Sequence, residues 1–278
     1  MIAVFTALYP EAQQLLDRFR KHGARMKRLE AGNLSVWKSE DENFLLALTG
    51  SGEIASAVTT ARVLTQFPAD FAVNFGTAAG NEPAGSCFCI DKITEEATGR
   101  DFYPGLEWRM PFDERALVTV PRVAPQSSDS GISHLIDMEG AGFFQAAARF
   151  LSPDRIVLLK VVSDAGNSSG LTADDLRKAC EVAAENVAGY LFWLQQAADA
   201  RAGAHADAWE TQLLAKAEKD LHGSEAMRQQ LRRIFRWQAL AGEDPEKLVH
   251  MLYADGSLPA SDKKKGKEVL EQLERDIL

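Results

Sequence analysis

The chain has few features that would place it in a membrane or in an oxidising compartment. Among its 278 residues no apolar run approaches the ~18–20 residues that a membrane-spanning helix requires. Its three cysteines form neither a Cys-x-x-Cys pair nor a disulfide framework, which favours a reducing cytoplasm. A formal net charge of −9 argues against a nucleic-acid-binding surface over the whole protein. We therefore expect a cytoplasmic protein that binds neither a membrane nor a nucleic acid.

Motifs for metals, dinucleotides and nucleoside triphosphates are also missing. The five histidines show neither an HExxH motif nor a paired spacing, so we expect no metal site. The glycine-containing stretches 49–52 and 76–80 match neither GxGxxG nor GxxxxGK[ST], and no cofactor is expected. The first residues carry no basic segment and turn polar after residue 9, which indicates a buried first strand and not a signal peptide.

What the sequence does contain is an alternation of strand and helix patterns over its first 200 residues. Short apolar runs predict strands at residues 2–7, 34–38, 44–49, 71–76, 87–97, 116–120 and 156–163. Helices are predicted to begin at Pro10 and to cover residues 54–67, 139–150 and 172–198, with a loop at 98–112. This order favours an α/β fold, in which a twisted mixed central sheet is flanked by helices on both faces.

The character of the chain changes after residue 200. Small residues at 202–206 predict a linker, and no strand pattern follows them. We expect a small C-terminal α-helical region at 205–278, with three or four helices, beside the α/β domain at 1–200. The apolar core of this region is predicted to contain Leu213, Leu214, Leu221, Leu231, Ile234, Phe235, Trp237, Leu240, Leu248 and Leu252. A basic stripe indicates a solvated helix face or, alternatively, an interaction surface; it consists of Arg228, Arg232, Arg233 and Arg236.

Three acidic residues, Glu11, Glu139 and Asp164, lie at the ends of apolar runs. Each has a structural explanation, since Glu11 and Glu139 would complement a helix N-terminus and Asp164 would cap a turn. In an open α/β sheet, however, ligands bind at the carboxyl ends of the strands. Carboxylates at that edge, beside glycines that permit close approach of a ligand to the backbone, predict a binding or catalytic site.

Five motifs in order resemble the nucleoside phosphorylase and nucleosidase superfamily. The resemblance covers residues 1 to about 200 and points to the hydrolytic branch, the methylthioadenosine/S-adenosylhomocysteine nucleosidases. The motifs are Ala7-Leu8-Tyr9-Pro10-Glu11, Leu48-Thr49-Gly50-Ser51-Gly52, Val73-Asn74-Phe75-Gly76-Thr77-Ala78-Ala79-Gly80, Asp137-Met138-Glu139-Gly140-Ala141 and Val161-Val162-Ser163-Asp164. Any one of them would be weak evidence, whereas the ordered set is fairly specific.

The resemblance implies hydrolysis of the N-glycosidic bond of a purine or 5′-modified purine nucleoside. In the family, the aspartate at the position of Asp164 donates a proton to purine N7, and Glu11 matches the acid that orients the attacking water. Glu139 matches the residue that binds the ribose hydroxyls, with Met138 against the sugar. The other predicted substrate contacts are Leu8, Ser51, Gly76, Thr77 and Ser163. Family members are commonly oligomers, which implies a homo-oligomer, with a dimer favoured, that acts on a small nucleoside.

The chain also departs from the family pattern. Asn74 stands where phosphorylases carry a phosphate-binding arginine, so water is favoured over phosphate as the nucleophile. Lys160 replaces an arginine that many nucleosidases carry four residues before the catalytic aspartate, and Ser51 replaces an apolar residue of the 5′ pocket. Segment 118–131 lacks the phenylalanine that stacks on the base in the family. A phosphorylase and a non-catalytic nucleoside-binding protein therefore remain as alternatives.

Overall fold

The computed structural model describes residues 1–105, 110–122, 134–164, 171–209, 212–240 and 243–277. The chain divides into two compact units, Met1–Gln196 and Ala197–Leu278. Each unit has its own cluster of buried apolar side chains, as is typical of domains. Helix α4 (Ala173–Trp209) begins in the first unit and ends in the second.

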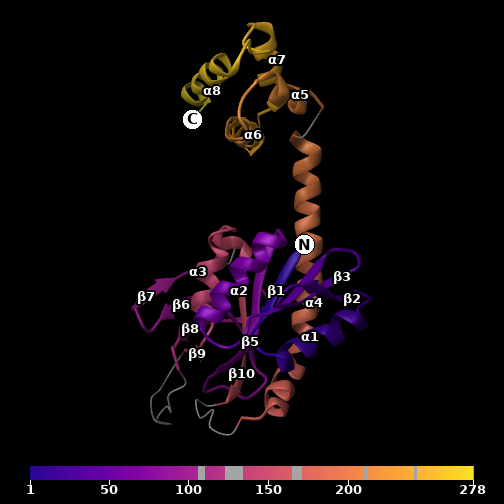
Figure 1. Ribbon diagram of the computed structural model, residues 1–278, viewed down its shortest axis with the longest axis vertical. Helices are drawn as coiled ribbons and strands as arrows, with labels where there is room; N and C mark the ends of the chain where they lie inside the picture. Colours follow the sequence, from indigo (N-terminus) through magenta and orange to yellow (C-terminus); the bar gives the residue numbers. More distant parts are fainter. Residues whose placement is uncertain (106–109, 123–133, 165–170, 210–211, 241–242, 278) are drawn as a thin grey trace. The chain divides into compact units, whose positions relative to one another are not determined.

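The first unit is built on a mixed sheet of ten strands among the described residues (Figure 1). Strands β1 (Ile2–Thr6), β4 (Phe44–Leu48), β5 (Phe71–Ala79) and β10 (Ile156–Asp164) lie side by side in parallel pairs. The other strands are β2 (Met26–Ala31), β3 (Leu34–Ser39), β6 (Cys87–Glu95), β7 (Arg100–Phe102), β8 (Asp113–Thr119) and β9 (Leu135–Asp137). Strands β5, β10, β6, β8 and β9 pair in a closed circuit, so this part of the sheet curls round on itself. The prediction of an α/β fold with a twisted mixed sheet is confirmed.

Helices cover both faces of this sheet (Figure 1). They are α1 (Tyr9–Lys21), α2 (Glu53–Gln66), α3 (Gly140–Ala147) and the first part of α4. On one face Phe19 of α1 stacks on Phe44, with the ring centroids 4.9 Å apart. On the other face Phe143 of α3 packs against Phe5, with the centroids 5.5 Å apart. Because successive strand residues point to opposite faces, a strand covered on both sides is apolar throughout, as all of β1 is buried.

The second unit consists of helices in the part of the chain that the structure describes. After the end of α4 these are α5 (Gln212–Asp220), α6 (Glu225–Leu240), α7 (Pro245–Ala254) and α8 (Lys263–Ile277). Seven predicted core side chains are buried together: Leu214, Leu221, Leu231, Ile234, Phe235, Leu248 and Leu252. Leu213 packs against this core, and the side chains of Trp237 and Leu240 lie outside the described residues. In neither unit is a described helix both long enough and apolar enough to cross a membrane.

Several predicted boundaries differ from the structure. The stretch 202–206, predicted as a linker, is helical and belongs to α4, because alanine-rich sequence has a high helix propensity. The predicted loop 98–112 contains the short strand β7, which pairs with β6. Strand β2 was not predicted, since its charged residues conceal it as an edge strand. The glycine-containing stretch 76–80 is not a turn over its whole length, because β5 continues through Ala79.

Candidate active site

A cavity of about 230 Å³ lies at the carboxyl edge of the sheet in the first unit. It is lined by Ala7, Leu8, Glu11, Ser51, Thr77, Ala78, Ala79, Val120, Ile136, Asp137, Met138, Glu139, Ser163, Asp164, Leu171 and Leu176. Eight of the nine predicted site residues are among them, and the ninth, Gly76, lies directly beside Glu11. Strands β1, β5, β9 and β10 therefore bring residues from four separate parts of the sequence to one cavity, which lies at the carboxyl ends of the parallel strands β1, β5 and β10.

Glu11 is held by donors from two strand ends. Its Oε1 accepts hydrogen bonds from the backbone N–H and the hydroxyl of Thr77, at 2.8 and 2.9 Å, and its Oε2 accepts from the Leu8 N–H at 2.9 Å. A Cβ atom on Gly76 would lie only 3.1 Å from Oε1, so the glycine leaves the space that the carboxylate occupies. With 2% of its surface exposed, Glu11 is buried at the base of the cavity in one fixed orientation.

Glu139 is the residue that precedes α3 and is also buried. Its Oε1 accepts a hydrogen bond of 2.6 Å from the backbone N–H of Gly52, at the turn between β4 and α2. Burial and the nearby charge of Asp137 raise the pKa of Glu139, and the positive charge of Lys160 only partly opposes them. Glu139 therefore joins the β4–α2 turn to the start of α3 and presents a carboxyl group to the cavity.

Lys160 is the buried cation beside this group of acids. It lies inside the apolar strand β10 with 1% of its surface exposed, and its Nζ is 2.8 Å from Asp137 Oδ2. Burial alone would lower the pKa of Lys160, but the charges of Asp137, Glu139 and Glu11 outweigh it and raise that pKa. The ammonium group consequently stays charged and stabilises several carboxylates at once. Sequence reasoning left Lys160 out of the site, although a lysine within an apolar run signals a buried charge that needs a partner.

Asp137 is fixed by two further donors. Its Oδ1 accepts from the Thr119 hydroxyl at 2.7 Å, and its Oδ2 accepts from the Gly140 N–H at 2.8 Å as well as from Lys160. The Thr119 hydroxyl in turn accepts from the Ala141 N–H at 2.9 Å. These bonds join β8, β9, β10 and the first turn of α3, so Asp137 fixes the structure that supports Glu139.

Asp164 and Ser163 end strand β10. The Ser163 hydroxyl lies 2.9 Å from Asp164 Oδ2, to which it donates a hydrogen bond. The pairing of β10 with β5 shifts register between Val162 and Asp164, an irregularity that turns the following side chains to a new direction and is common beside active sites. Both side chains are half-buried and line the cavity. Asp164 therefore lines the same cavity as Glu11 and Glu139.

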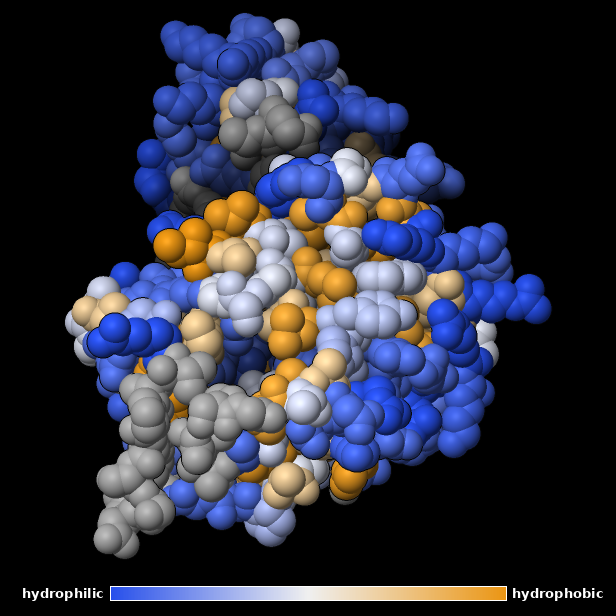
Figure 2. Space-filling model, turned by 60° about the horizontal axis from the view of Figure 1, so that its bottom comes forward, coloured by the Kyte–Doolittle hydropathy of each residue, from blue (hydrophilic) through white to orange (hydrophobic). Residues whose placement is uncertain are grey.

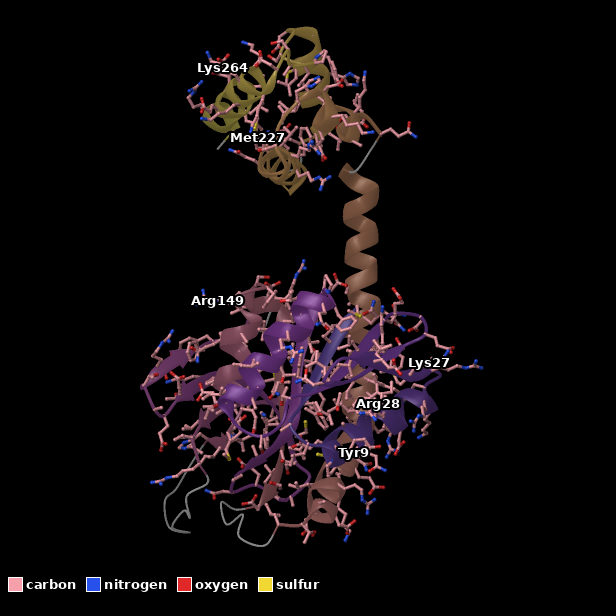
Figure 3. The ribbon with its side chains drawn as sticks, viewed as in Figure 1. Tyr9, Lys27, Arg28, Arg149, Met227 and Lys264 are labelled. Carbon is pink, nitrogen blue, oxygen red and sulfur yellow. The ribbon has the colours of Figure 1, made fainter. Side chains whose placement is uncertain are left out.

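Much of the cavity lining is apolar. Leu8, Met138 and the exposed Ser51 belong to the lining, and Val120, Ile136, Leu171 and Leu176 are lining residues that sequence reasoning missed. Tyr9, labelled in Figure 3, follows Leu8 and lies with its ring centroid 6.1 Å from that of Trp37. Figure 2 shows the first unit from the side that lies at the bottom of Figure 1, and apolar and polar patches adjoin on this surface. Most of segment 118–131, where the family's base-stacking residue would lie, is outside the described residues.

Solved structures of nucleosidases and of a futalosine hydrolase share the fold of the first unit. A methylthioadenosine/S-adenosylhomocysteine nucleosidase from Neisseria meningitidis, solved with methylthio-immucillin-A, is 21% identical with a TM-score of 0.55, over 67% of this chain and 96% of that one. A futalosine hydrolase mutant from Helicobacter pylori is 14% identical with a TM-score of 0.55, over 66% and 95%. The corresponding nucleosidase from Colwellia psychrerythraea, solved with adenine, is 18% identical with a TM-score of 0.55, over 68% and 93%.

Comparison by sequence adds nothing to this likeness. No protein-family model matches the chain, and no curated protein matches it. The similar structures leave the C-terminal helical extension uncovered, so the likeness concerns the first unit. Among the described residues, no group of three or more histidine, cysteine, aspartate or glutamate side chains could hold a metal ion.

Proposed function

We propose that the protein hydrolyses the N-glycosidic bond of a purine or 5′-modified purine nucleoside, with water as the nucleophile. The observation that carries the proposal is the convergence of Glu11, Glu139 and Asp164 on one cavity in a nucleosidase fold. Three carboxyl groups suit a reaction that needs a proton donor, an oriented water and a negative environment for the sugar. A nucleosidase is an enzyme that needs no cofactor for these steps.

Asp164 is the proposed general acid. When the bond between C1′ and the base breaks, its electron pair passes to the purine, and the Asp164 proton is transferred to N7. The base then leaves as a neutral molecule. Ser163 donates a hydrogen bond to Asp164 Oδ2 and orients the carboxyl group. General acid catalysis of this kind contributes typically about 10²–10⁴-fold to a rate.

Glu139 and Met138 are the proposed ribose contacts. As the bond breaks, positive charge develops on the sugar, and preorganised negative groups stabilise it. Glu11, Glu139 and Asp137 lie near the cavity, with Lys160 as the buried cation that interacts with all three. Lys160 allows the carboxylates to lie close together in the folded protein. The carboxylates in turn stabilise the positive charge of an oxocarbenium-like transition state.

Glu11 is the proposed group that orients the attacking water. Thr77 and Leu8 hold both carboxylate oxygens, so the side chain cannot swing away when the substrate enters. Glu11 would accept a hydrogen bond from the water, direct its oxygen to C1′ and take up the proton that the water loses as the new bond forms, while Asp164 gives its proton to the departing base. This division of tasks between two carboxyl groups is the one that glycosidic hydrolysis requires.

Phosphate is less well suited than water to this cavity. Asn74, at the position of the phosphorylase arginine, is 2% exposed and donates from Nδ2 to the Phe5 carbonyl at 3.3 Å. No lysine or arginine occurs among the described residues that line the cavity. A phosphate anion there would lie beside several carboxylates whose single neighbouring cation, Lys160, already acts on three of them, and the repulsion would be unfavourable. This supports the nucleosidase over the phosphorylase alternative.

The protein is also proposed to be a homo-oligomer, with a dimer favoured. Ile54 and Val58 lie one turn apart on α2, and 81% and 54% of their surfaces are exposed. An apolar stripe of this kind on a surface helix suits contact with a second copy of the chain. The cytoplasm stays the predicted location.

The test of the function is release of free base from adenosine, inosine, methylthioadenosine and S-adenosylhomocysteine, each with and without phosphate. Release independent of phosphate is expected, and Asp164→Asn should abolish it while circular dichroism shows an intact fold. Release only with phosphate would make the protein a phosphorylase. Tight binding of a nucleoside without release would favour the non-catalytic alternative, and an Asp164→Asn protein with most of its activity would refute the role of that residue.

A further inference from the structure

Two carboxyl groups are in hydrogen-bond contact where α2 begins. Glu53 is the first residue of α2 and Glu95 is the last residue of β6. Both side chains pack on α3, since a Cβ atom on Gly142 would lie 2.7 Å from Glu53 Cγ and Gln145 Nε2 donates to Glu95, and this brings the two carboxyl groups close enough to share a proton. Glu95 is 8% exposed. Two ionised carboxylates cannot form a hydrogen bond and repel each other, so one of the pair must hold a proton. Among the described residues that line the cavity neither glutamate occurs, and the proposed reaction leaves this pair without a task.

The neighbours of the pair decide which residue holds the proton. Glu95 accepts hydrogen bonds from the Thr98 hydroxyl and, at 3.0 Å, from Gln145 Nε2. The Thr98 bond and then the bond from Glu53 lower the pKa of Glu95, with help from the charge of Arg100. Burial, the bond to Glu95 and the charges of Glu95 and Asp137 raise the pKa of Glu53 to about 7. Glu53 is therefore the donor and Glu95 the acceptor.

The position of Glu53 is coupled to the cavity through its preceding residue. Gly52 has a φ of +97°, which disfavours other residues, and its N–H makes the 2.6 Å hydrogen bond to Glu139 Oε1. On the other side, a Cβ atom on Gly142 of α3 would lie 2.3 Å from the carbonyl oxygen of Glu53, so α2 and α3 are in close contact. The start of α2 is thus held between α3 and Glu95, and any shift of Glu53 moves the donor that orients Glu139.

We propose that Glu53 is a positioning residue for the ribose site, whose shared proton with Glu95 holds the Gly52 N–H against Glu139. The inference rests on the proposed function of Glu139. Loss of the proton places two ionised carboxylates in contact. The charged groups that act on the pair are Glu95 on β6, Asp137 on β9 and Arg100 on β7, and α3 carries no charged residue between its ends.

Ionised Glu53 consequently faces negative Glu95 and negative Asp137, with Arg100 near Glu95 only. Repulsion then drives the start of α2 away from β6, and the Gly52 N–H loses its position at Glu139. Because Glu139 is proposed to bind the ribose hydroxyls, the result is weaker nucleoside binding at alkaline pH. The site therefore responds to pH through a residue that does not touch the substrate.

The experiment compares pH profiles of kcat and KM for the wild type and Glu53→Gln with the best nucleoside substrate. Glutamine keeps an N–H donor for Glu95 but has no proton to lose. Above about pH 7 the kcat/KM of the wild type should fall relative to Glu53→Gln by up to about tenfold per pH unit, chiefly through KM. Groups that titrate alike in both proteins cancel in the ratio. Parallel profiles would overturn the proposal.

A second variant and a control accompany this comparison. Glu95→Gln removes the repulsion from the opposite side, so it should show the same relative gain at alkaline pH and replaces Glu53→Gln if that variant does not fold. Glu96→Gln changes the exposed neighbouring glutamate and should keep the profile of the wild type. A shift in the control as large as that in Glu53→Gln would contradict the assignment.

Thermal unfolding gives a readout that is independent of turnover. The pKa of Glu53 is raised from 4.5 to about 7 in the folded state. Its contribution to stability is therefore fully present below pH 4.5 and is lost as the pH rises from there to about 7. The melting temperature of the wild type should therefore fall relative to Glu53→Gln over this range. If no nucleoside is hydrolysed, the proposed function fails, and nucleoside affinities measured by calorimetry over the same pH range then decide the inference. Equal pH dependence of affinity in both proteins would overturn it.

Discussion

The Lys160 Nζ atom lies 2.8 Å from Asp137 Oδ2, and the two side chains are 2% and 0% exposed. An ion pair so far from solvent is unfavourable to break, because removal of one partner leaves a buried charge without compensation. The pair joins strands β9 and β10. Asp164 is the last residue of β10, and Glu139 follows two residues after the end of β9. The stability of the sheet and the geometry of the site are therefore linked at this contact.

Replacement of Lys160 by methionine should lower the free energy of unfolding by about 3–5 kcal/mol, because Asp137 is left as an unpaired buried charge. Chemical denaturation followed by circular dichroism measures the loss. The double variant Lys160→Met with Asp137→Asn removes both charges and should regain a large part of it. A single variant that unfolds at the same denaturant concentration as the wild type would show that the pair is unimportant for stability.

Gly76→Ala should impair turnover more than folding. The added Cβ would lie 3.1 Å from Glu11 Oε1 and would push the carboxylate out of its position. We expect a fall in kcat of about tenfold, since a displacement of about 1 Å at a catalytic group can cost up to about 10²-fold. Base-release kinetics measure it.

Gly189→Ala is the matched control for Gly76→Ala. Gly189 lies within α4 and an added Cβ would meet no atom within 4 Å, so this variant should keep its activity and gain about 0.5–1 kcal/mol in stability. Equal kcat values in the wild type and Gly76→Ala would contradict the proposed role of Glu11.

Ile54→Lys with Val58→Lys should reduce the oligomer to a monomer. Both positions are exposed on α2, so the substitutions leave the core intact while they place two charges in the proposed contact with a second copy. Light scattering coupled to size-exclusion chromatography measures the mass. Val182→Lys changes a valine of α4 that is 69% exposed and should leave the mass unchanged. A wild-type protein that is already monomeric would refute the predicted dimer.

Gly266→Ala should destabilise the second unit without a loss of activity. The Cβ would lie 2.1 Å from the Leu221 carbonyl oxygen, so α8 must move away from the end of α5, at a cost of about 1–3 kcal/mol. Lys264, labelled in Figure 3, is exposed on the same helix, and Lys264→Ala is the control. Calorimetric unfolding together with base-release kinetics tests this. A large loss of kcat would show that the helical unit contributes to the site.

Sequence patterns predicted most of the strands of the first unit because apolar periodicity and strand ends are local properties. They also placed Glu11, Glu139 and Asp164 at strand ends, and parallel pairing then brings such ends to one edge. The same patterns failed for β2, whose residues are mostly charged, and at 202–206, where small residues are compatible with either a linker or a helix.

The sequence by itself determined the α/β class and the acidic residues Glu11, Glu139 and Asp164 that line the cavity. Only the tertiary structure decided which charged groups lie next to one another, as in the contact of Lys160 with Asp137 and of Glu53 with Glu95. The partners in these contacts lie 23 and 42 residues apart in the sequence, at positions 137 and 160 and at positions 53 and 95, and only the folded chain brings them together. The physical reason is that protonation depends on burial and on the nearest charges, which a chain acquires only when it folds.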